Sequence, residues 1–257
     1  MDKAQLLRDR LNGIIESLKA TGDALALLGL GSVGADQMDA YSDLDFFVIV
    51  RPGTKQRFID SIDWLEKAAP VVFHYHNTVD SHRILFADGV FGEPAVFEPQ
   101  ELSDIPFAPG RLLWAVDGFD ESLTVPRSTV NLPEPRSADF LLGEALASLY
   151  IGLSRYRRGE RLSAFHHVQR HAVDSVVALA LHVEAAQPAR VDIYDASRRF
   201  EQRYPDVAAH LPDFLPGYAR TVESARAILA FLEAHFDVNP AMKAAILTLA
   251  EGHDDGL

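Results

Sequence analysis

Hydrophobic residues recur at two different spacings in the first part of the chain, and each spacing predicts a different kind of element. Between residues 6 and 18 they recur every three or four positions, which is typical of a helix with one apolar face. An uncharged run at 24–30 favours a strand that is buried on both faces. The β-rich run at 44–50 predicts a second strand. A second helix is expected at 55–67 and a third strand at 71–76. Helices and strands are therefore mixed in this region.

An Asp-Gly pair between two apolar runs predicts a β-hairpin. Its strands cover residues 83–87 and 90–97, and Asp88 and Gly89 form the turn. Pro94 has no N–H group to donate, so we expect an edge position or a bulge in the second strand.

The pattern changes near residue 133, because only helical spacing follows. Helices are expected at 137–157, 161–185, 194–203, 218–235 and 240–250. The proline-containing segment 131–135 is interpreted as a linker, and 251–257 as a frayed tail. The predicted fold class is an α/β (α+β) N-terminal domain with a mixed sheet, residues 1–130, followed by an all-helical C-terminal domain, residues 131–257.

Composition excludes several classes of function. The chain has 257 residues with 37 acidic and 24 basic side chains, a net charge of −13, which argues against nucleic acid as the main partner. There is no cysteine, so disulfides, thiolate nucleophiles and cysteine-ligated zinc are excluded. No apolar run approaches the roughly 20 residues of a membrane span, and the N-terminus lacks a signal-peptide core. A cytoplasmic protein without a membrane partner is expected.

Two carboxylates stand at the start of the second apolar strand. Residues i and i+2 of a strand point the same way, so Asp43 and Asp45 share a face with β-carbons roughly 6–7 Å apart. Carboxylates this close repel each other unless a cation lies between them. Ligation by oxygen alone suits Mg²⁺ or Mn²⁺.

A glycine-containing turn leaves the preceding strand. Gly31 lets backbone N–H groups and the Ser32 hydroxyl approach a phosphate closely. Ser32 is also expected to cap a short helix that begins near Val33. A phosphate cradle beside a metal-binding pair is what phosphoryl or nucleotidyl transfer needs.

The pattern Gly31-Ser32-x10-Asp43-Leu44-Asp45, between two hydrophobic strands, resembles the signature of the nucleotidyltransferase superfamily that includes DNA polymerase β. Residues 31–45 are similar to its antibiotic-modifying branch, the aminoglycoside and lincosamide nucleotidyltransferases. The resemblance covers residues 24–50 and extends to about 105. It implies that Asp43 and Asp45 bind metal and, with Gly31 and Ser32, the nucleotide.

The resemblance also implies a third metal-binding and catalytic carboxylate on a later strand. Glu93, in the second strand of the predicted hairpin, is our choice for it, and Glu98 is the reserve.

The function implied by the resemblance is Mg-dependent transfer of a nucleoside monophosphate, AMP in the first instance, from ATP or another NTP to a hydroxyl of a small molecule. Net acidity favours a cationic acceptor such as an aminoglycoside. A lincosamide is equally compatible. The acceptor is expected between the two domains, the helical one serving as substrate-binding domain. Glu144 and Glu160 are candidates for the general base.

Two other functions are compatible with such a fold. One is a non-enzymatic binding or antitoxin-like module, against which the presence of the carboxylates argues. The other is an adenylyltransferase that modifies a protein hydroxyl. An oligomer is compatible with each function.

Histidine and arginine clusters are interpreted as structural or pocket-lining. His74 and His76 share a strand face. His167 and His171 are spaced by four on a helix, but this pair lacks a Glu beside the first His and a third ligand in register. A group of arginines is interpreted as a helix C-terminus rather than a phosphate site. These are Arg155, Arg157, Arg158 and Arg161.

Overall fold

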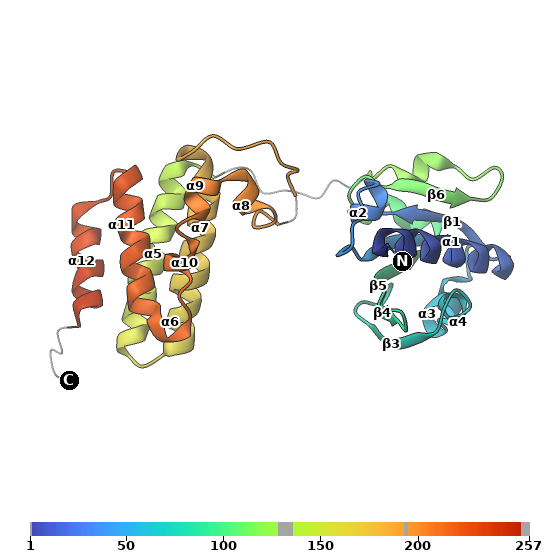
Figure 1. The fold of residues 1–257 in the computed structure, drawn as a ribbon, viewed down its shortest axis with the longest axis horizontal. Helices are drawn as coiled ribbons and strands as arrows, with labels where there is room; N and C mark the ends of the chain where they lie inside the picture. The colour runs from blue at the N-terminus through green and yellow to red at the C-terminus, as the bar shows by residue number, and fades with distance from the viewer. Residues whose placement is uncertain (1, 128–135, 193–194, 253–257) are drawn as a thin grey trace. The chain divides into compact units, whose positions relative to one another are not determined.

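The computed structural model describes residues 2–127, 136–192 and 195–252. The chain divides into two compact units, Met1–Asn131 and Leu132–Leu257. The first unit contains a mixed β-sheet with helices, and the described part of the second contains helices and no strand (Figure 1). The predicted fold class is therefore confirmed.

Two predicted segments fall at the limits of the described residues. The interpreted linker 131–135 lies outside them, and so does the predicted tail from residue 253 onward. No helix in the described ranges has the length and apolar character that crossing a membrane would require.

The sheet has six strands in the order β3-β4-β5-β2-β1-β6. They are β1 (Ala24–Gly29), β2 (Leu44–Val50), β3 (Val71–His76), β4 (His82–Phe86), β5 (Phe91–Phe97) and β6 (Arg111–Ala115). β2 and β5 are parallel, and the other neighbours are antiparallel. The pairing of β4 with β5 confirms the predicted hairpin. β6, which pairs with β1, was not predicted.

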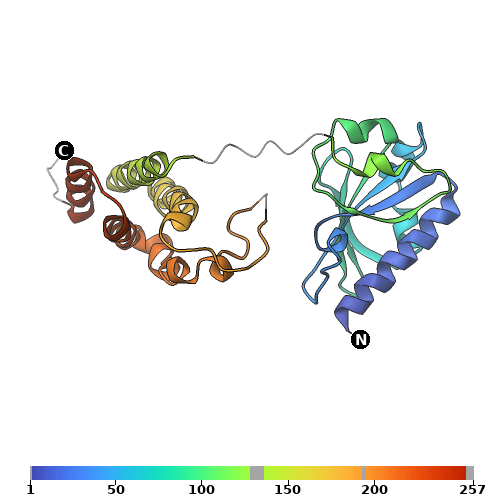
Figure 2. The same cartoon turned by 90° about the horizontal axis from the view of Figure 1, so that it is seen from above.

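Helices cover one face of this sheet. They are α1 (Lys3–Thr21), α3 (Lys55–Asp60) and α4 (Asp63–Glu66). The long α1 runs along the sheet (Figure 2) and buries Leu7, Ile14 and Leu18 against a core that includes Phe46 and Trp64. This burial of apolar surface is the main stabilising contribution in the unit.

The opposite face has a smaller core beside the short helices η1 (Pro99–Ser103) and η2 (Glu121–Thr124). Ile49, Ala95 and Phe97 are buried there, and Phe47 is half-buried. Because side chains alternate along a strand, Asp45 and Glu93 lie on this second face.

The predicted helix at 55–67 is wrong in one respect, because α3 and α4 are separate. Ser61 is extended between them, with φ −136° and ψ 127°. The break lets Phe58 and Trp64 both enter the core, where the indole N–H of Trp64 donates to the Phe58 carbonyl at 3.2 Å.

The predicted edge position of Pro94 is also wrong, since β5 lies inside the sheet. Paired residues of β4 and β5 are Ile84 with Gly92 and Leu85 with Phe91, and an isolated bridge joins Ser81 to Ala95 in the same register. The pairing lapses where Pro94, which has no N–H, faces β4.

The second unit is built on α5 (Ala138–Arg157), α11 (Thr221–His235) and α12 (Pro240–Glu251), as predicted within a few residues. Its other elements are α6 (Arg161–His166), the π-helical segment η3 (His167–Ala172), α7 (Val173–Leu179), η4 (Ala180–His182), α8 (Phe200–Arg203), α9 (Pro205–Ala208), α10 (Leu211–Phe214) and η5 (Tyr218–Arg220). The prediction of one α-helix over 161–185 is therefore corrected to a run ending at His182. Within the described residues, the prediction at 194–203 is correct only for α8, because 196–199 form turns.

Candidate functional site

The turn after β1 is held directly against the start of β2. The Leu30 N–H donates to the Asp45 carbonyl at 2.8 Å, and Gly31 has a left-handed φ of +50°. A β-carbon on Gly31 would lie 2.7 Å from Oδ2 of Asp45, closer than such atoms approach. A glycine is therefore required at this position for two reasons: the left-handed backbone conformation and the carboxylate packed against it.

Ser32 does not have the predicted capping role. The helical turn α2 (Gly31–Gly34) begins two residues earlier than expected, with Leu30 as its N-cap. The Ser32 hydroxyl oxygen is shielded from solvent and makes no hydrogen bond to the described residues. A buried polar group without a hydrogen bond costs about 1–3 kcal/mol of stability. The Ser32 hydroxyl is therefore a candidate for binding a ligand at this site.

Asp43 and Asp45 occupy the end of β2 next to this turn. Asp43 immediately precedes the strand, Leu44 is fully buried in the helix-covered core, and both aspartates are half-buried. The loop leading to them carries an exposed ion pair of 3.1 Å between Arg111 and Asp36.

Glu93 lies in the row next to Asp45. The two residues are paired in the register of the parallel strands β2 and β5, which run about 4.8 Å apart. The Glu93 carboxylate is not turned to a cluster of acids, however, because it forms an ion pair with Arg83, Oε1 to Nε at 2.9 Å.

Glu98 lies at the other end of β5. Five residues separate it from Glu93, or about 16 Å along a strand. It accepts a hydrogen bond from the Gly53 N–H at 2.7 Å, which with the Gln100 amide lowers the pKa of the Glu98 carboxyl. Of the two candidates for the third carboxylate, the register favours Glu93.

The donor set suits a hard divalent cation. Asp43, Asp45 and Glu93 offer only carboxylate oxygens, the ligands that Mg²⁺ prefers, and the unpartnered Ser32 hydroxyl lies on the turn packed against Asp45. Within the described ranges, no three or more acidic or histidine side chains are already arranged to hold a metal ion.

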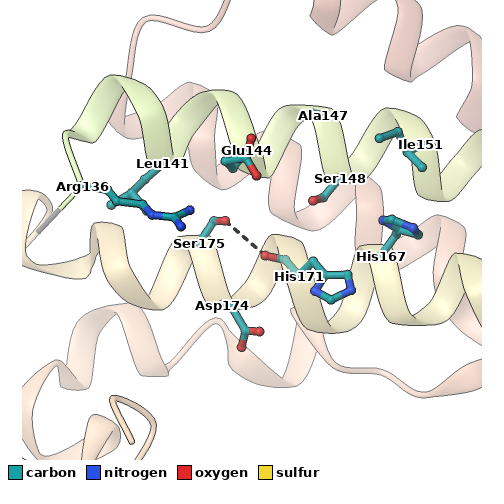
Figure 3. A pocket seen from close by; sticks show the side chains of 10 residues that line it. All are labelled: Arg136, Leu141, Glu144, Ala147, Ser148, Ile151, His167, His171, Asp174 and Ser175. Carbon is teal, nitrogen blue, oxygen red and sulfur yellow. Dashed lines mark hydrogen bonds between the residues drawn. The ribbon is translucent and has the colours of Figure 1, made fainter. Parts of the chain in front are cut away.

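Glu144 lines a cavity of about 420 Å³ in the helical unit (Figure 3). Its walls come from α5, η3 and α7, and its polar side chains are Arg136, Glu144, Ser148, His167, His171, Asp174 and Ser175. The His167 and His171 rings are 5.3 Å apart, and burial together with the nearby His171 and Arg155 lowers the pKa of His167. The two histidines therefore line a pocket, one of the two roles expected for them.

Glu160 has a different environment. It is exposed and forms an ion pair with Arg155 at 3.1 Å. Two other arginines of the cluster also have contacts inside the unit: Arg157 donates to the Leu249 carbonyl at 2.7 Å, and Arg161 lies 3.5 Å over the Tyr156 ring. Three of the four arginines lie at the C-terminal end of α5, as interpreted, but the interpretation is wrong for Arg161, which is the first residue of α6.

Arg83 is a site residue that the sequence analysis missed, although a signal for it existed. Phe86 and Val90 face each other across the Asp88-Gly89 turn, with the Phe86 N–H donating to the Val90 carbonyl at 2.9 Å. Counting outward from this pair places Arg83 opposite Glu93.

Gly31→Ala is expected to lower the free energy of unfolding of the first unit by about 1–2 kcal/mol, the cost of a left-handed L-residue. It is also expected to reduce the nucleotidyl transfer that the resemblance implies at least about tenfold, because Asp45 is displaced. Gly53→Ala is the matched control, since Gly53 has φ +83° with open space around its β-carbon position. Urea unfolding followed by tryptophan fluorescence reports this unit alone, because Trp64 and Trp114 both lie in it. Equal activity of the two variants would refute the contact with Asp45.

Comparison with known proteins finds similarity in solved structures only. No protein-family model and no curated protein matches the chain. The structure of an aminoglycoside 6-adenyltransferase from Bacillus subtilis is 17% identical, with 95% of this chain and 97% of that chain covered and a TM-score of 0.39. A nucleotidyltransferase-like protein from Exiguobacterium sibiricum 255-15 is 16% identical, with 84% and 70% covered and a TM-score of 0.31.

Since both TM-scores are below 0.5, the function proposed below is based on the residues of this chain.

Proposed function

We propose that this chain is a nucleotidyltransferase that moves a nucleoside monophosphate, in the first instance AMP, from an NTP to a hydroxyl of a small molecule, with Mg²⁺ or Mn²⁺ as cofactor. The observation that carries the proposal is the contact between the Gly31 turn and the Asp45 carboxylate, with Asp43 two residues before and Glu93 one strand away. This contact supports the proposal that a phosphate cradle and oxygen ligands for a cation lie at one end of β2.

In this proposal each group of the chain has one task. The Gly31 turn and the Ser32 hydroxyl bind the phosphates, and Asp43, Asp45 and Glu93 hold the cation. A cation bound there would neutralise the negative charge that develops on the phosphates. The acceptor hydroxyl attacks the α-phosphorus in line, a new O–P bond forms, the bond to pyrophosphate breaks, and the hydroxyl proton passes to a general base.

The acceptor and the base are proposed from charge and from the cavity of the helical unit. A net charge of −13 favours a cationic acceptor, and Glu144 and Asp174 give the cavity two exposed carboxylates. An amine-bearing polyol such as an aminoglycoside, or a lincosamide with its single amine, suits such a cavity. Glu144 is preferred over Glu160 as the base, because Glu160 is paired with Arg155.

The direct test is incubation of the protein with Mg²⁺, labelled ATP or GTP, and a panel of aminoglycosides and lincosamides, followed by mass spectrometry. A nucleoside monophosphate adduct on a panel member supports the proposal. Label on protein instead would point to modification of a protein hydroxyl. Nucleotide binding without any transfer would favour a binding module.

Nucleotide binding is expected to need the cation. Three carboxylates face a triphosphate with three to four negative charges, and unit charges about 4 Å apart repel by roughly 4 kcal/mol at an effective dielectric constant of 20. Affinity for ATP should therefore fall at least about tenfold in EDTA, and Ca²⁺ should restore binding better than turnover. Calorimetric titration with and without Mg²⁺ measures this. Equal affinity would mean that the triphosphate does not meet these carboxylates.

A further inference from the structure

Glu93 stands between two possible partners. On one side its register partner is Asp45 of β2, and on the other side Arg83 of β4 holds it at 2.9 Å. Arg83 also donates from a terminal guanidinium nitrogen to the hydroxyl of Tyr75 at 3.3 Å. The row Asp45, Glu93, Arg83, Tyr75 therefore crosses four strands on one face of the sheet.

The ion pair is exposed enough to exchange. The side chains of Arg83 and Glu93 are 43% and 32% exposed, and pairs of this kind are weakly held compared with buried ones. Arg83 Nε and Glu93 Oε1 lie 2.9 Å apart as an ion pair that lacks the alignment of a hydrogen bond. Carboxylate and phosphate oxygens both match the planar guanidinium fork. The same guanidinium can therefore serve a carboxylate in one state and a phosphate in another.

We propose that the Arg83 guanidinium pairs with the Glu93 carboxylate in the metal-free protein. When a divalent cation binds Glu93, Arg83 moves to the phosphates of the nucleotide. This inference rests on the proposed function and assigns a positioning and phosphate-binding residue to it. Without ligands, Arg83 lowers the mutual repulsion of three acids. With ligands, it offsets part of the charge of the triphosphate instead of competing with the metal ion.

The two parts of the proposal predict opposite effects of one substitution. Arg83→Gln should tighten Mn²⁺ binding to the nucleotide-free protein by roughly threefold, because Glu93 no longer has to give up an exposed ion-pair partner. With the cation present, the same substitution should weaken binding of a non-hydrolysable ATP analogue by roughly tenfold, because a charged hydrogen bond to phosphate is lost. A merely structural residue would not produce a gain and a loss together.

A double-mutant cycle separates direct pairing from a general effect of charge. In a Glu93→Gln background, Arg83→Gln should change Mn²⁺ affinity less than about twofold, whereas a general field would act equally in both backgrounds. Arg51→Gln, at the other end of β2, is the charge-matched control and should leave Mn²⁺ affinity unchanged. Arg83→Lys should keep part of the competition with the metal ion but lose most of the phosphate binding.

The readouts are free Mn²⁺ measured by electron paramagnetic resonance and analogue binding measured by calorimetry, with circular dichroism to check that each variant is folded. Unchanged or weaker Mn²⁺ binding in folded Arg83→Gln would overturn the competition with metal, and unchanged analogue affinity would overturn the phosphate contact. If the wild-type protein binds neither Mn²⁺ nor the analogue, the proposed function itself fails.

Discussion

Asp43→Asn and Asp45→Asn are each expected to abolish nucleotidyl transfer while the protein stays folded. Stabilisation of transition-state charge by a bound cation amounts to several kcal/mol, so losing one carboxylate ligand should lower the transfer rate by at least about a thousandfold at 1.4 kcal/mol per tenfold. Stability should be unchanged or slightly higher, because the repulsion between two carboxylates is relieved in the metal-free protein.

The measurement pairs a transfer assay with urea unfolding of the first unit. Asp60→Asn is the control, since this aspartate is an exposed carboxylate of α3 on the helix-covered side and changes the charge equally. It should keep full activity. Activity retained by Asp43→Asn or Asp45→Asn within a few-fold of wild type would contradict the assignment of that carboxylate to the cation.

The elements that sequence patterning predicts well are those whose burial follows from their own residues. The α1 helix and strands β1 and β2 have continuous apolar faces or runs, so the pattern alone determines them. Strand β6 was missed because Arg111–Ala115 is short and becomes a strand by pairing with β1, a contact distant in sequence. The break between α3 and α4 likewise depends on a core that both helices share. Tertiary contacts, not local preference, decide these cases.

The candidate site divides in the same way. Spacing along the chain predicts that Gly31 and Asp45 come from neighbouring strands, and the structure adds the packing of one against the other. The partner of Glu93 follows from the hairpin register, which can be predicted from the Asp-Gly turn. The burial of the Ser32 hydroxyl could not be predicted, because it depends on a helical turn that begins at Gly31 rather than later. Contacts that depend on three-dimensional packing cannot be predicted from a single sequence.

His82 is a buried titratable group whose burial could not be predicted from the sequence. It begins β4, is 1% exposed, and has ring nitrogens without a well-formed hydrogen bond to the described residues. The His76 and His74 rings lie 4.3 and 6.3 Å away, centroid to centroid. Burial, and then the neighbouring His76 and His74, lower the pKa of His82 to about 4, and the Ile59 backbone opposes this only in part.

The sign of the resulting pH dependence follows from the two protonation states. The unfolded chain takes up a proton at His82 near pH 6.5, whereas the folded chain resists it until about pH 4. The stability that neutral His82 contributes is therefore complete above pH 6.5 and is lost as the pH falls from 6.5 toward 4. Between pH 7.5 and pH 4.5 the loss amounts to roughly 2–3 kcal/mol from this residue.

His82→Phe is expected to remove that part of the pH dependence, because phenylalanine fills a similar volume and binds no proton. The free energy of unfolding of the first unit, from urea titrations followed by the two tryptophans, should fall between pH 7.5 and pH 4.5 by roughly 2–3 kcal/mol less in the variant than in the wild type. His74→Gln, at an exposed position of β3, should keep most of the wild-type dependence. If His82→Phe and the wild type lose the same free energy over this range, His82 is not held neutral by burial, and the acid sensitivity of the unit must come from its other titratable groups.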